Sequence, residues 1–96
     1  MPEQEREQVV RREITKSPTF ISLYANDVQV HTSPWDVRLL LGSVGELPTA
    51  DHPVVNITQL ADLRMSPQLA KRLVAIMIEQ IKVYEERFGP IPDIPG

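Results

Sequence analysis

The stretch that decides the fold is SPQLAKRLVAIMIEQIKVYEERFGP, residues 66–90. It opens with Ser66, whose side chain suits a helix N-cap, and Pro67 stands at the first helical position, where its missing N–H costs nothing. It closes with Gly89-Pro90, a pair that ends helices. Apolar residues recur between these ends at helical spacing. The sequence therefore predicts one amphipathic helix of about 23 residues, roughly 35 Å long.

The apolar arc of this predicted helix is wide. At about 100° per residue, its apolar side chains cover roughly 220° of the helix circumference. A helix that lies on one sheet needs an apolar surface of only about 100–140°. Either the loop and the termini cover the excess, or a second copy of the chain does. We favour the second copy.

The charges of the predicted helix are reversed relative to its macrodipole. Lys71 and Arg72 lie near its N-terminal end, whereas Glu85 and Glu86 lie near its C-terminal end. Two such helices packed antiparallel would place the bases of one opposite the acids of the other, although a random surface pattern explains the charges equally well. We predict a homodimer whose interface includes Lys71, Val74, Ile78, Ile81, Glu85 and Phe88.

Four stretches before the helix have the composition of strands. Residues 19–25 and 28–32 flank the turn signal Asn26-Asp27, and residues 35–44 follow a turn at Ser33-Pro34. A loop over residues 42–53 precedes residues 54–65, which alternate as a fourth strand, with a short helix over 58–63 as the competing assignment.

The predicted fold is α+β, with about four antiparallel strands in a meander followed by one long helix packed on the sheet. With 96 residues, the chain has room for one domain, which we place at residues 18–90. Residues 1–17 are predicted to be a flexible tail and residues 91–96 an extended one. The predicted core consists of Leu39, Leu41, Ile57, Leu73, Met77, Ile81 and Tyr84.

Composition excludes several classes of function. The chain has no cysteine, which excludes disulfides, thiolate metal sites and cysteine nucleophiles. The net charge of −3, with interspersed signs, argues against nucleic acid as the main partner. No apolar run has the length of a membrane span or of a signal peptide, so we expect a cytoplasmic protein with no membrane contact.

The side chains that could carry chemistry are few and scattered. His31 and His52, the only histidines, are too isolated to form a metal site, and we predict no catalytic residue, metal or cofactor. Trp35 follows a turn proline on the inward parity of its strand, which favours packing in the core. The alternative is that Trp35 faces a protein partner, with Asp36 bonding the turn beside it.

Three hypotheses for function remain. We favour a non-enzymatic, homo-oligomeric interaction or adaptor module with the helix as assembly surface. A nucleic-acid-associated regulatory factor would use a cluster of Arg11, Arg12, Lys16, Arg64, Lys71 and Arg72, if these converge in space. A ligand or enzymatic site in a dimer cleft would require a concave pocket with convergent polar groups.

Several blocks of the sequence resemble a known family. They are Tyr24-Ala25-Asn26, Ser33-Pro34-Trp35-Asp36-Val37, residues 65–73, and residues 84–91. In this order they resemble a family of small bacterial proteins that is known only as domain of unknown function 3467, over about residues 19–92. One departure is Leu69, where the family more often has a histidine. The resemblance implies a compact α+β domain and no activity, substrate or cofactor.

Overall fold

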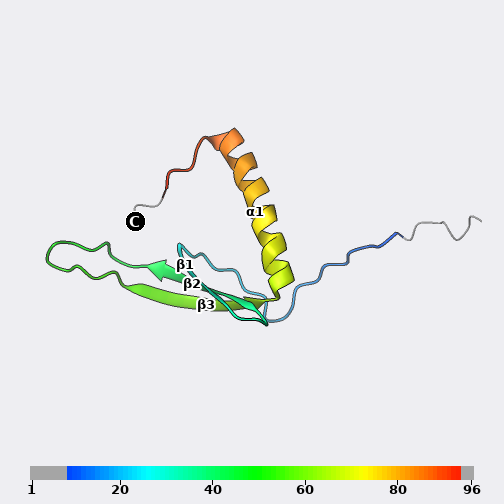
Figure 1. Ribbon diagram of the computed structural model, residues 1–96, viewed down its shortest axis with the longest axis horizontal. Coiled ribbons are helices and arrows are strands. Elements are labelled where there is room, and N and C mark those ends of the chain that lie inside the picture. The colour runs from blue at the N-terminus through cyan, green and yellow to red at the C-terminus, as the bar shows by residue number, and fades with distance from the viewer. Residues whose placement is uncertain (1–8, 94–96) are drawn as a thin grey trace, which may run out of the picture.

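The computed structural model of the chain describes residues 9–93 (Figure 1). Its elements are β1 (Asp27–Thr32), β2 (Val37–Val44), β3 (Ile57–Met65) and α1 (Pro67–Phe88). The three strands form one antiparallel sheet in the order β1-β2-β3. The fold is therefore α+β, as predicted, with a meander followed by a C-terminal helix. It has three strands in residues 9–93 where the sequence predicted four.

The segment that fails to form a strand is residues 19–25, which lies outside the sheet. The cause is the anchoring of Asn26. Its backbone N–H donates to the Gly42 carbonyl at 3.0 Å, and its side-chain oxygen accepts from the Val44 N–H at 2.8 Å. The chain before β1 therefore lies against the sheet instead of pairing at its edge. An open hollow of about 380 Å³ lies between this segment and the sheet. It is lined by Ile21, Ser22 and Leu23 of the segment and by Leu41, Ala61 and Leu63 of the sheet.

The turn between β1 and β2 is held by the Ser33 side chain. Its hydroxyl donates to an Asp36 carboxylate oxygen at 2.8 Å and accepts from the backbone N–H groups of Trp35 and Asp36, both at 3.1 Å. The Ser33 N–H donates to the Asp36 carbonyl at 2.9 Å. Trp35 thus belongs to the turn and not to β2. The prediction that Trp35 packs in the core is wrong, because the turn presents its ring to solvent with 84% exposure.

Strand β3 extends over residues for which a short helix was the competing assignment. It pairs with β2 from Val37↔Met65 to Val44↔Ile57, with one irregularity between Leu41 and Gly42. Gly42 is needed there, because an added Cβ would lie 3.0 Å from both the Ile57 side chain and the Thr58 carbonyl oxygen. A helix over residues 58–63 is therefore excluded, and the loop between the strands covers residues 45–56.

Both predicted ends of the helix are confirmed. The Ser66 hydroxyl accepts from the Leu69 N–H at 3.1 Å, and Pro67 occupies the first helical position. At the other end, Gly89 has φ 98° and donates its N–H to the Glu85 carbonyl at 2.9 Å. The Glu85 carboxylate also accepts from the Ile91 N–H at 2.8 Å, which ties the following segment to the last turn.

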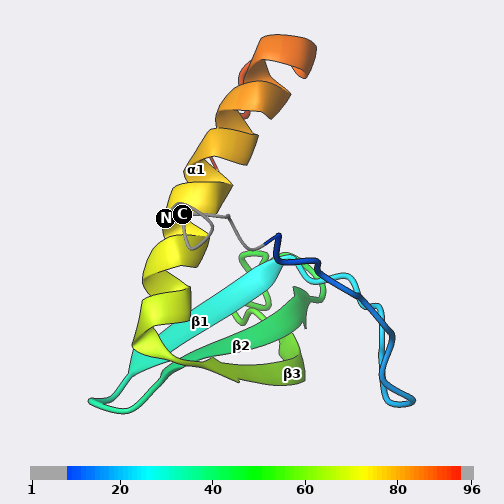
Figure 2. The same cartoon turned by 90° about the vertical axis from the view of Figure 1, so that its right-hand side faces the viewer.

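The position of α1 differs from the prediction. The helix leaves the end of β3 steeply and rises away from the sheet, so that most of its length lies against no strand (Figures 1 and 2). Within residues 9–93, no apolar side chain is fully buried. The predicted core is therefore not formed within one chain: Leu39, Leu41 and Leu73 are half-buried, and Ile57, Met77, Ile81 and Tyr84 are exposed.

Candidate functional site

The strand register gathers apolar residues on one side of the sheet. Val28 is opposite Leu41 and Val30 is opposite Leu39. In the next pair of strands, Leu39 is opposite Leu63 and Leu41 is opposite Ala61. Because paired residues project to the same side, these side chains share one face. We call Val28, Val30, Leu39, Leu41, Ala61 and Leu63 the apolar sheet face.

This face is open in the single chain. Val28, Val30 and Leu63 retain 47–58% of their surface exposed, although residues of their type are normally buried when they share a sheet face. Residues 21–23 line an open hollow together with Leu41, Ala61 and Leu63 of this face and leave these residues short of full burial. Exposed apolar patches of this kind are typical of surfaces that bind another protein.

Helix α1 exposes a second apolar surface. Its apolar arc consists of Leu69, Ala70, Leu73, Val74, Ile76, Met77, Ile78, Ile81, Val83, Tyr84 and Phe88. No residue of α1 is fully buried, and the exposure of the apolar residues of the predicted interface ranges from 42% at Ile81 to 69% at Phe88. The Tyr84 and Phe88 rings lie 4.9 Å apart between centroids, so one turn separates two exposed aromatic groups. Lys71 is exposed, and Glu85, whose carboxylate accepts from the Ile91 N–H, is half-buried.

The accessible surface of the chain is larger than that of a folded monomer of the same mass. This surplus indicates apolar surface that contacts within one chain do not cover. A folded monomer of 10.9 kDa exposes about 5,600 Å². This chain exposes 9331 Å². Both the extended segments outside the sheet and helix and the open faces of α1 and the sheet add to the difference. Obligate dimer interfaces bury about 2,000–5,000 Å² in total, which this surplus can supply.

The opposite side of the sheet is polar and forms ion pairs. Arg38 on β2 makes two hydrogen bonds to Asp62 on β3, at 3.3 and 2.9 Å, and Arg64 lies 3.4 Å from the same carboxylate. The hydrogen bond from Arg38 lowers the pKa of Asp62 below its ordinary value of 3.8, and Asp62 in turn raises the pKa of Arg38. The two guanidinium groups share this one carboxylate across the strands, so the cluster keeps a net positive charge.

The other basic residues of the predicted cluster do not converge. Arg11 pairs with Glu13 at 3.0 Å, and the Lys16 ammonium group lies 5.1 Å from the centre of the Phe20 ring. Arg12 and Arg72 line one hollow with Leu69 and Ile76. Arg12 and Arg72 are therefore the only two of the six predicted basic residues that line a common hollow.

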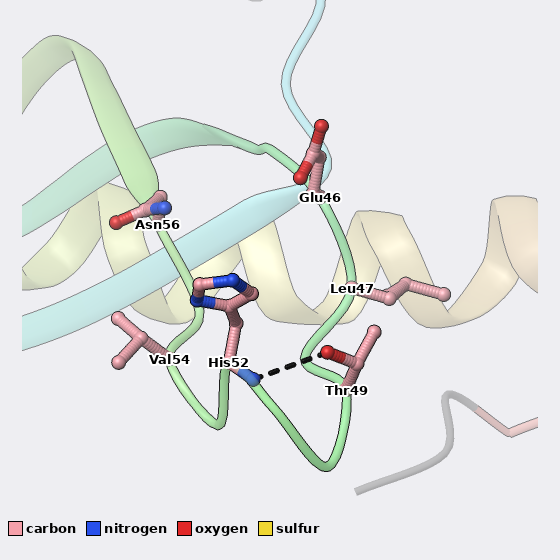
Figure 3. Close-up of a pocket in the computed structure, with 6 residues that line it drawn as sticks. All are labelled: Glu46, Leu47, Thr49, His52, Val54 and Asn56. Atoms are coloured by element: carbon pink, nitrogen blue, oxygen red, sulfur yellow. Dashed lines mark hydrogen bonds between the residues drawn. The ribbon is translucent and has the colours of Figure 1, made fainter.

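The loop over residues 45–56 forms a further hollow of about 270 Å³, lined by Glu46, Leu47, Thr49, His52, Val54 and Asn56 (Figure 3). Its tip is closed by hydrogen bonds between Thr49 and His52, including 3.1 Å from the His52 N–H to the Thr49 hydroxyl. The His52 ring lies between the arms of the loop, whereas Leu47 points outward (Figure 3). The hollow contains one histidine and one carboxylate, and residues 9–93 contain no group of three or more metal-ligating side chains.

The comparisons with known proteins give a family and no activity. The model of the family described as protein of unknown function (DUF3467) matches residues 1–93. The chain belongs to this family. No curated protein and no solved structure matches the chain. Over the part of the chain that the structure describes, α1 is the only helix, and it is not apolar enough to cross a membrane.

The sequence predicted one of the two apolar surfaces and not the other. It predicted the exposed face of α1 with the interface residues Val74, Ile78, Ile81 and Phe88, and it assigned the sheet residues to a core. The apolar sheet face had a signal, namely the alternation of Val28-Gln29-Val30 and Leu39-Leu40-Leu41. What the alternation could not indicate is that the chain's own helix leaves this face open.

Proposed function

We propose that the protein is a non-enzymatic interaction module that assembles as a homodimer through α1. The observation that carries the proposal is the exposure of most of the apolar arc, from Leu69 to Phe88, on a helix with well-formed caps at both ends. A helix in water draws most of its stability from packing of its apolar face. An ordered helix without such packing is therefore a component of a larger assembly.

The placement of the polar groups supports a role in binding over a role in catalysis. On the polar side of the sheet, Arg38 and Arg64 are held by ion pairs to Asp62. The carboxylate of Glu85 holds the segment after the helix. The large open surfaces are apolar, and they suit contact with another polypeptide.

Trp35 supports the adaptor part of the proposal. Its ring is 84% exposed on a turn that Ser33 and Asp36 hold rigid, so that little freedom is lost when a partner covers it. We assign Trp35 and Asp36 to a partner-facing surface separate from α1. Trp35→Ala should abolish capture of a heterologous protein partner and leave the dimer intact. Loss of the dimer would instead place Trp35 in the self-association interface.

Sedimentation equilibrium at tens of micromolar tests the homodimer. The expected mass is about 22 kDa, twice that of one chain. Val74→Asp should shift the mass to that of the monomer, because it places a charge in the apolar arc. Glu79→Asp is the matched control, since it puts the same residue into the polar side of the helix. A wild-type chain that is folded and monomeric would refute the proposal.

The alternative, a nucleic-acid-associated regulatory factor, has one supporting observation, the shared hollow of Arg12 and Arg72. Arg11, Lys16 and Arg64 each have another neighbour, and Lys71 lies on the exposed side of α1. A mobility shift with DNA or RNA at low salt, lost in Arg12→Ala and Arg72→Ala, would favour this alternative over the proposal.

A further inference from the structure

We propose that two copies of the chain exchange their helices, so that α1 of each copy covers the apolar sheet face of the other. This inference rests on the proposed self-association and specifies its geometry. In a dimer formed by the two helices alone, the sheets would take no part in the interface. In the exchanged dimer, each contact is formed by the helix of one copy and the sheet of the other.

The joint between β3 and α1 gives the first argument. Met65 ends β3 and Pro67 begins α1, so Ser66 alone connects them. The Ser66 hydroxyl is held by the Leu69 N–H, and the proline ring restricts the next backbone angle. Connections between strands and helices usually have about 2–6 residues. A shorter and anchored joint directs α1 away from its own sheet, and short hinges favour exchange of elements between copies.

The dimensions of the two surfaces give the second argument. The 22 residues of α1 form a rod about 33 Å long, and the strands, with 6, 8 and 9 residues, extend over about 20–30 Å. Three strands spaced about 4.8 Å apart form a face whose width suits one helix of about 10–12 Å diameter. One helix therefore covers one sheet, and each chain contains one of each. A two-fold dimer satisfies both surfaces.

The width of the apolar arc gives the third argument. Contact with a sheet uses about 100–140° of the roughly 220° available on α1. Leu73, Met77 and Ile81 lie near the middle of the arc, where the partner's sheet would contact them. The residues at the two margins of the arc are then free to contact the helix of the partner, because both helices lie between the two sheets. The exchange thus provides a contact for the whole arc.

Charge complementarity is compatible with this arrangement. If the two-fold axis is perpendicular to the helices, the two helices are antiparallel, which places Lys71 and Arg72 of one copy near Glu86 of the other. Glu85 retains one carboxylate oxygen beyond the one that accepts from Ile91. These surface pairs contribute little to affinity, and they favour the antiparallel direction over the parallel one.

Mixing two defective variants tests the exchange. Val30→Asp damages the sheet face and Met77→Asp damages the helix, so each variant alone should be monomeric. In an exchanged heterodimer, the intact helix of the Val30→Asp chain lies on the intact sheet of the Met77→Asp chain. One of the two helix–sheet contacts is therefore restored, and native mass spectrometry should detect a 1:1 heterodimer. Gln29→Asp, on the opposite side of β1, is the control that should remain a homodimer.

The other outcomes overturn the inference in distinguishable ways. If Val30→Asp remains a homodimer, or if the mixed variants stay apart, the exchange is wrong although self-association through α1 stands. If the wild type is monomeric, the proposed function fails as well. A second test leaves every residue of the helix and of the sheet unchanged. Inserting Gly-Ser-Gly-Ser between Met65 and Ser66 should let α1 fold back on its own sheet and convert the dimer into a monomer. A dimer that survives the insertion with unchanged affinity overturns the exchange.

Discussion

Replacement of Ile81 by alanine gives the sharpest measure of how much α1 contributes to assembly. Ile81 is 42% exposed in the single chain. Full burial of an isoleucine side chain stabilises by about 1.5–3 kcal/mol, so covering the remaining surface is worth about 0.6–1.3 kcal/mol per copy. A symmetric dimer covers two copies, and alanine retains a part of each. Ile81→Ala should therefore weaken dimerisation by about 1–2 kcal/mol, which raises Kd roughly 5- to 30-fold.

The assay is a dilution series followed by sedimentation or mass photometry, with Lys82→Ala as the matched control. Both substitutions place alanine, the best helix former, into the same turn of α1. Any loss specific to Ile81→Ala therefore cannot come from helix propensity. A change in Kd below twofold in Ile81→Ala, or an equal change in Lys82→Ala, would refute the assignment of Ile81 to the interface.

Three further predictions concern the fold itself. Because Arg38 lowers the pKa of Asp62, the ion pair stabilises the folded state above the ordinary pKa and is lost as the pH falls through the lowered one. Asp62→Asn should therefore be less stable than the wild type in urea at neutral pH, with a difference that vanishes at acid pH; an unchanged difference would contradict the pairing. Ser66→Ala should cost about 1 kcal/mol in the same assay through loss of the bond to Leu69, whereas Ser66→Asp, which keeps an acceptor, should cost less. Gly89→Ala should cost about 1–3 kcal/mol, because φ 98° suits glycine alone, and equal stability would show that the last turn relaxes.

The ends of the helix were predictable because they depend on neighbouring residues. The bond from the Leu69 N–H to Ser66 and the positive φ of Gly89 are local geometry, and each residue type favours its position strongly. The failed strand over residues 19–25 shows the opposite case. Its composition suits a strand, yet its path depends on the bonds of Asn26 to Gly42 and Val44, which are distant in sequence. Pairing between distant segments cannot be derived from local propensity.

The candidate surfaces were predictable in composition and not in location. The wide apolar arc of α1 was visible from the spacing of its residues, and it predicted a surface beyond what one sheet covers. The position of Trp35 was predicted wrongly as core, because parity was counted through a turn that Ser33 closes. Parity indicates a face only while a strand is regular, and the turn interrupts the alternation before β2 begins.

In the proposed dimer, folding and assembly are coupled. Ordering a residue costs about 1–2 kcal/mol of backbone entropy, which burial of apolar surface must offset. Residues 9–93 of one chain contain no fully buried apolar side chain, while the apolar sheet face and the arc of α1 are both open. The sheet face and the arc of α1 each need an apolar surface to cover them. The single-residue joint at Ser66 keeps the two apart within one chain. In the proposed dimer, a second copy would supply the missing contact to both at once, so the association that forms the interface would also form the hydrophobic core.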